Sequence, residues 1–206
     1  PVRTIKVALK DVGLDFERIM GVFVTHDHAD HVKSVGNLSI DYNLPVYTTG
    51  KVHEGIIRNY CVSKKIPHDN IRVIEKGQTY KIGGFLVTPF EVPHDSSDNV
   101  GYRIEAEGVV FCLITDAGSI TDEMKRQISE ANYLVIEANH DERMLVCGPY
   151  PKKLKDENIH TCLDTAGVGF GNYEELLKYI DLVLLDVKHT GKEGYKDITG
   201  SELGEV

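Results

Sequence analysis

The sequence of 206 residues has no tryptophan and only four cysteines, none of which forms a C-x-x-C pair. A disulfide framework or a cysteine-ligated zinc site is therefore not expected, and we interpret the cysteines as reduced, mostly buried thiols. No apolar run approaches the roughly 18 residues that span a bilayer, and no basic-then-apolar leader begins the chain. We therefore expect a soluble, cytoplasmic protein that has no membrane partner.

Positive charge is also scarce, because 23 Lys and Arg residues stand against 32 Asp and Glu residues, giving a net charge of −9. This balance argues against a broad electropositive surface that grips a phosphate backbone nonspecifically. Any anionic substrate must be held locally, and a cation bound in a cleft would do this. The apolar fraction of 41% and the charged fraction of 27% are those of an ordinary globular protein.

Short apolar runs alternate with helix-like segments, a pattern that predicts an α/β fold. The expected strands cover residues 21–25, 46–47, 71–74, 85–90, 100–106, 109–115 and 134–137, and the expected helices cover residues 32–42 and 121–131. From residue 152 the sequence predicts a βαβ unit with strands at 158–164 and 182–187 and a helix at 172–179. No internal repeat is evident.

The run Thr25-His26-Asp27-His28-Ala29-Asp30-His31 follows a predicted buried strand. Ligand sites of α/β sheets gather at the carboxyl ends of strands. Imidazole and carboxylate are the usual ligands of zinc and related divalent metals. His26 and His28 can point the same way from a short turn, while Asp30 and His31 are placed to face a second ion.

This run resembles the signature of the metallo-beta-lactamase superfamily, which implies a four-layer αβ/βα sandwich. The resemblance implies that His94 is the third histidine of the first metal site and that Asp116 is the carboxylate bridging both ions. Asp30 and Asp116 would then hold the metal pair that activates a water molecule. Asp27 either orients a ligand imidazole or is a plain turn residue.

Residues 1–151 resemble most closely the bacterial exonuclease-like phosphodiesterase branch, on phrases such as Ile114-Thr115-Asp116-Ala117-Gly118 and Glu137-Ala138-Asn139-His140-Asp141. The resemblance implies two divalent ions, zinc foremost with manganese or iron as alternatives, a cleft histidine at His140, and nucleic acid or another phosphodiester as substrate. A thioester hydrolase of the same fold and a catalytically inactive metal-binding fusion remain alternatives. The oligomeric state is left open.

Two departures from the family pattern concern the ends of the chain. The strands and the aspartate that precede the metal turn in the family are absent, so an N-terminally truncated domain is expected. Residues 152–206 resemble instead a fragment of pyruvate formate-lyase activating enzyme, a radical S-adenosylmethionine protein, packed on the same domain as a βαβ segment. Because the C-x-x-x-C-x-x-C motif is missing, no iron–sulfur cluster of that type is expected. His189 follows the last strand and is a candidate second-site ligand.

Overall fold

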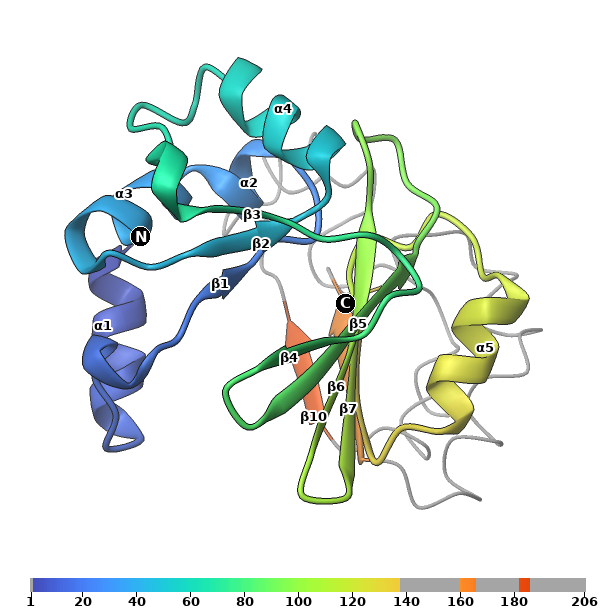
Figure 1. Ribbon diagram of the computed structural model, residues 1–206. Coiled ribbons are helices and arrows are strands. Elements are labelled where there is room, and N and C mark those ends of the chain that lie inside the picture. The colour runs from blue at the N-terminus through green and yellow to red at the C-terminus, as the bar shows by residue number, and fades with distance from the viewer. Residues whose placement is uncertain (1, 138–159, 166–181, 186–206) are drawn as a thin grey trace, which may run out of the picture. The chain divides into compact units, whose positions relative to one another are not determined.

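The computed structural model describes residues 2–137, 160–165 and 182–185 (Figure 1). The chain divides into two compact units, Pro1–Ala106 and Glu107–Val206. Helices and strands alternate in both units, which confirms the predicted α/β class. The domain boundary expected at residues 151 and 152 lies outside the described residues and stays a prediction.

The first unit carries most of the described helices and two sets of strands. Its elements in chain order are α1 (Val2–Asp11), the 3-10 helix η1 (Phe16–Arg18), β1 (Val22–Phe23), α2 (Ala29–Val32), α3 (Val35–Tyr42), β2 (Val46–Thr48), α4 (Gly50–Arg58), the 3-10 helix η2 (His68–Asn70), β3 (Ile71–Val73), β4 (Tyr80–Ile82), β5 (Phe85–Glu91) and β6 (Val100–Ala106).

Strands β1, β2 and β3 form a small parallel sheet in that order. Val46 is the central pairing residue, since it is in register with Val22 on one side and Ile71 on the other. The paired part of β1 ends at Phe23, short of the expected Thr25, because the chain there turns into the histidine run. The carboxyl end of β1 therefore delivers this turn, as the sequence predicted.

The other strands of the first unit, β4, β5 and β6, form an antiparallel ladder. Ile82 pairs with Phe85 across a two-residue turn in which Gly83 has φ 58°. Glycine at the first central position allows this tight hairpin turn. Residues 92–99 connect β5 to β6 and carry His94.

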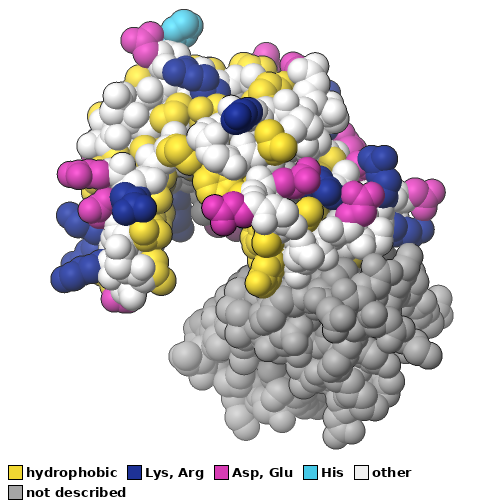
Figure 2. Space-filling model, turned by 60° about the horizontal axis from the view of Figure 1, so that its bottom comes forward, with side chains coloured by type: hydrophobic (Ala, Val, Ile, Leu, Met, Phe, Trp, Pro, Cys, Tyr) yellow, Lys and Arg dark blue, Asp and Glu magenta, His cyan; other side chains and the backbone are white. Residues whose placement is uncertain are grey.

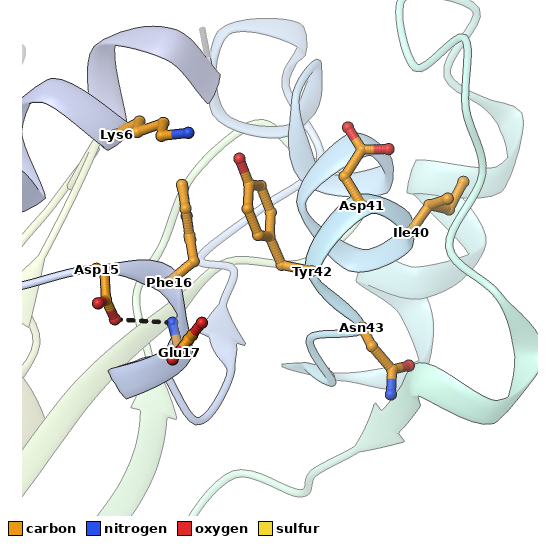
Figure 3. Close-up of a pocket in the computed structure, with 8 residues that line it drawn as sticks. All are labelled: Lys6, Asp15, Phe16, Glu17, Ile40, Asp41, Tyr42 and Asn43. Atoms are coloured by element: carbon orange, nitrogen blue, oxygen red, sulfur yellow. Dashed lines mark hydrogen bonds between the residues drawn. The ribbon is translucent and has the colours of Figure 1, made fainter.

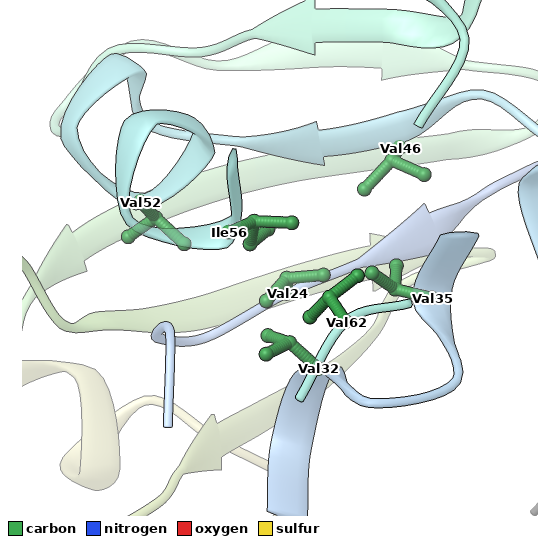
Figure 4. Packing of buried hydrophobic residues seen from close by; sticks show 7 residues of the cluster. All are labelled: Val24, Val32, Val35, Val46, Val52, Ile56 and Val62. Carbon is green, nitrogen blue, oxygen red and sulfur yellow. The ribbon is translucent and has the colours of Figure 1, made fainter. Parts of the chain in front are cut away.

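A valine-rich core includes Val24, at the end of the strand that leads into the histidine run (Figure 4). Its side chains come from the end of β1, from β2 and from helices α2, α3 and α4 and the segment after α4; they are Val24, Val32, Val35, Val46, Val52, Ile56 and Val62. Burying each such side chain contributes about 1.5–3 kcal/mol relative to exposure. The core therefore fixes α2 and α4 against the strand that leads into the histidine run.

The single helix expected at residues 32–42 is instead two helices, α2 and α3, separated at Lys33 and Ser34. A Cβ atom on Gly36 would lie 1.6 Å from the carbonyl oxygen of Lys64, so α3 begins where another backbone segment passes at close range. The helix ends at Asn43, whose φ of 51° is the left-handed conformation common at helix ends. This break lets α2 form as a separate short helix immediately after His28.

The second unit contains β7 (Val109–Ile114), α5 (Asp122–Ser129), β8 (Tyr133–Glu137), β9 (His160–Thr165) and β10 (Leu182–Leu185). These strands are parallel in the order β7, β8, β9, β10. Thr121 caps α5 by accepting a hydrogen bond from the backbone N–H of Met124. Both strands of the expected C-terminal βαβ unit are confirmed, while its helix at 172–179 lies outside the described residues.

Charged side chains of both signs are interspersed on the face shown in Figure 2, where the described residues form no broad basic surface. Among the described helices, none is long and apolar enough to cross a membrane. Of the cysteines, Cys112 is buried as expected, but Cys61 is exposed.

Candidate metal centre

The backbone that enters the histidine run is fixed by hydrogen bonds from neighbouring strands. The carbonyl oxygen of Val24 accepts from the hydroxyl of Thr48 at 2.8 Å and from that of Tyr102 at 2.6 Å. Burial raises the pKa of Tyr102, so its hydroxyl stays protonated and able to donate. The backbone N–H of Val100 donates to the carbonyl oxygen of Thr25 at 3.0 Å. The backbone just before His26 is thus tied to both β2 and β6.

His26 is the most deeply placed of the candidate ligands, with a side chain that is 0% exposed. Its Nδ1 lies 3.1 Å from the hydroxyl oxygen of Thr25, which is also buried. A hydrogen bond at one ring nitrogen fixes the tautomer and orientation of the imidazole, leaving the other nitrogen to act as a ligand.

His28 and His94 complete a cluster with His26, although 66 residues separate His28 from His94. The candidate ligand atoms of the three side chains all lie within 4.8 Å of one another. Nε2 of His94 is 3.2 Å from Nδ1 of His28. Tetrahedral zinc with Zn–N bonds near 2.0–2.1 Å places its ligand nitrogens about 3.3 Å apart. The donor chemistry and spacing of this cluster therefore fit a divalent metal ion.

His31 and Asp30 lie beside this cluster. The ring centroid of His31 is 4.1 Å from that of His26. The carboxylate of Asp30 lies 3.6 Å from Nε2 of His31, and the Asp30 side chain is 77% exposed. Asp30 thus contacts the His31 ring rather than the three-histidine cluster itself.

The other predicted site residues belong to the second unit. Asp116 follows β7 and has φ 51°, a conformation that aspartate tolerates better than most residues. The next residue, Ala117, donates its N–H to the carbonyl of Glu137 at the end of β8. His140 and His189 lie outside the described residues, so their roles stay predictions.

Two further histidines lie outside the cluster. His68 is fully exposed. His53 lies in α4, which turns it inward and leaves it 5% exposed. Its Nε2 lies 3.2 Å from the carbonyl oxygen of Arg72, and burial lowers its pKa.

A separate hollow of about 470 Å³ lies between α1, η1 and α3 (Figure 3). Its wall includes the side chains of Lys6, Asp15 and Asp41, together with Phe16 and Tyr42, whose rings stack 3.7 Å apart. None of the predicted ligands lines this hollow. We therefore place the candidate site at the histidine cluster.

An α/β fold that carries an H-x-H-x-D-H turn after a parallel strand, with a third histidine added from the β5–β6 connection, defines a metal-dependent hydrolase of the metallo-beta-lactamase class. Residues 6–168 match the beta-lactamase superfamily domain, and the chain belongs to this family.

One relative and one solved structure extend the comparison. The chain is 33% identical over 192 residues to exodeoxyribonuclease YycJ of Bacillus anthracis, an alignment that covers 89% of this chain and 70% of that protein. The fold is similar to that of Zn(2+)-bound PqqB from Methylobacterium extorquens, with a TM-score of 0.61 and 19% identity over 82% of this chain and 71% of that one. The predicted metallo-beta-lactamase fold and the exonuclease-like resemblance are confirmed.

A short match to a different family is also present. The chain is 63% identical over 49 residues to the pyruvate formate-lyase-activating enzyme of Clostridium pasteurianum, covering 24% of this chain and 21% of that enzyme. The predicted resemblance to a fragment of this enzyme is confirmed. Because the three-cysteine motif is absent from the sequence, the similarity brings no cluster ligands of that type with it.

Proposed function

We propose that this chain is a phosphodiesterase that hydrolyses nucleic acid with the help of two divalent metal ions, zinc foremost and manganese or iron as alternatives. The observation that carries the proposal is the convergence of His26, His28 and His94 from two distant segments, with ligand atoms within 4.8 Å. The similarity to a protein named as an exodeoxyribonuclease supports nucleic acid as the substrate class.

In this proposal, His26, His28 and His94 hold the first ion. Asp30, His31 and Asp116 would hold the second ion, with Asp116 a ligand of both. His140 would act as a catalytic group, and His189 is a candidate final ligand. The assignments of Asp116, His140 and His189 rest on their sequence context. Bound divalent ions lower the pKa of a coordinated water toward neutrality and neutralise charge on a phosphoryl group.

The chain's own residues contribute orientation and charge. The buried hydroxyl of Thr25 fixes the ring of His26, and the backbone contact with Val100 fixes the turn. With a net charge of −9, the chain needs a local positive centre to hold a phosphodiester. Bound cations at the histidine cluster would be that centre.

The experiment is an assay of end-labelled single- and double-stranded DNA beside a thioester substrate, with zinc or manganese added. We expect DNA hydrolysis and no thioester hydrolysis. A His26→Ala, His28→Ala double variant should lose at least about 100-fold in rate, because it cannot hold the ion that activates water. His68→Ala is the matched control, since this histidine is fully exposed and outside the cluster.

Two outcomes would contradict the proposal. Thioester hydrolysis without DNA hydrolysis would assign the chain to the other chemistry of this fold. Failure to hydrolyse either substrate despite bound metal would make the chain a metal-binding protein without this activity.

A further inference from the structure

Asp27 lies between two candidate ligands, His26 and His28, but its carboxylate contacts neither imidazole in the described hydrogen bonds. Instead, Oδ1 accepts from the backbone N–H of Ser97 at 3.1 Å, and Oδ2 accepts from the Ser97 hydroxyl at 2.6 Å. Ser97 is 70 residues away in sequence. It belongs to the β5–β6 connection, the same segment that supplies His94. One carboxylate therefore joins the two segments that carry the three-histidine cluster.

Helix α4 holds Asp27 from another side. The side-chain amide of Asn59, just after α4, donates to the Asp27 carbonyl oxygen at 2.8 Å. A Cβ atom added to Gly55 would lie 2.0 Å from Oδ2 of Asp27, so the helix backbone touches the carboxylate. These contacts leave Asp27 little freedom to turn away from Ser97.

The Ser97 side of the pair is also anchored. The neighbouring carboxylate of Asp98 accepts from the hydroxyl of Thr49 at 2.8 Å and from the Lys76 ammonium group. Ser97 is thus presented to Asp27 by a segment held by Thr49, the N-cap residue of α4, and by Lys76 in the β3–β4 connection.

We propose that Asp27 and Ser97 form a clamp that sets the spacing between the His26–His28 turn and His94 before a metal ion binds, and so determines the metal affinity of the cluster. The proposal rests on the proposed function in one respect, that these histidines hold a metal. Without the clamp, metal binding must itself bring the two segments together, which costs conformational entropy. Outer contacts of this kind change metal affinity by about 10- to 100-fold.

The test compares single variants by Co²⁺ and Zn²⁺ affinity, measured by competition with a chromophoric chelator, and by the visible absorption spectrum of bound Co²⁺. Asp27→Ala and Ser97→Ala should weaken binding by about 10- to 100-fold and alter the spectrum. Asp27→Asn and Ser97→Thr should stay within about threefold of the parent, since an amide can still accept from the Ser97 N–H and a threonine keeps the hydroxyl.

Ser96→Ala is the matched control, because it removes a hydroxyl one residue away whose contact stays inside its own segment. It should leave the affinity and the Co²⁺ spectrum near those of the parent. Because Ser97 is exposed, Ser97→Ala should still fold. It therefore tests the clamp even where Asp27→Ala fails to fold. The thermal midpoint of each metal-free variant separates lost stability from lost affinity.

The outcomes distinguish the clamp from the proposed function. Parent affinity and spectrum in both Asp27→Ala and Ser97→Ala, with metal binding still abolished by the His26→Ala, His28→Ala double variant, would overturn the clamp alone. Equal weakening by Ser96→Ala and Ser97→Ala would also overturn it, because the effect would then belong to the whole connection. A parent that binds no metal would overturn both.

Discussion

At the scale of the residue, burial separates histidines that sequence spacing alone does not. His26 and His53 are both buried, whereas His68 is fully exposed. His26 faces other imidazoles, while His53 contacts the backbone of Arg72. The same side chain therefore serves as a candidate ligand in one place and as a packed polar residue in the other.

Substitution of His53 should change how stability depends on pH. Burial lowers the folded-state pKa of His53 below 6.5, so the unfolded chain binds more protons as the pH falls through and below 6.5. The contribution of His53 to stability is therefore present above this pH and is lost progressively as the pH falls toward the folded-state pKa. Urea unfolding at pH 7.5 and pH 5.5 should show a smaller loss of stability in His53→Gln than in the parent.

The parent and the His53→Gln variant share every other titrating group, so the difference between their two pH responses isolates this side chain. An equal loss of stability in both proteins would contradict the assignment of a lowered pKa.

At the scale of the element, α4 shows why part of the fold could not be predicted. The sequence analysis gave no helix at residues 50–58, where Gly50 and Gly55 lower the helix propensity. Gly55 is required because the carboxylate of Asp27 occupies the space of a side chain. The contact that makes glycine necessary there is thus the same contact that weakened the local helix signal.

A matched pair of substitutions in α4 tests this explanation. Gly55→Ala should destabilise the protein by about 1–3 kcal/mol, because the added methyl group collides with Asp27. Gly50→Ala in the same helix should be neutral or slightly stabilising, since the nearest atom to the added Cβ is 3.9 Å away and alanine favours helix. Chemical denaturation measures both, and equal effects would refute the collision.

Other elements were predictable to the extent that their signals are local. The strand expected at 100–106 is β6 with the same bounds, and the helix expected at 121–131 is α5. The helix expected at 32–42 is divided at Lys33 and Ser34, and the close approach of the Lys64 backbone to Gly36 within α3 joins segments far apart in sequence. Likewise, His26 and His28 were evident from their spacing, whereas the contact of Asp27 with Ser97 joins residues 70 positions apart and leaves no sequence pattern.

At the scale of the whole molecule, net charge sets how a phosphodiester can be held. A chain of net charge −9 repels a polyanion in general, so under the proposed function its affinity for DNA would come from cations bound at the histidine cluster. In 0.15 M salt, the metal-free protein should bind a hydrolysis-resistant single-stranded DNA more weakly than about 10⁻⁴ M. Fluorescence anisotropy with and without zinc measures this, and tight binding by the metal-free protein would refute it.

The central claim is that His26 and His28, with His94, hold a divalent metal ion. Its most direct test is the metal content per chain, determined by atomic emission after equilibration with zinc and removal of free metal, in the parent, in the His26→Ala, His28→Ala double variant and in His68→Ala. We predict that the parent and His68→Ala retain zinc while the double variant loses it. Metal content in the double variant equal to that of the parent would contradict the claim.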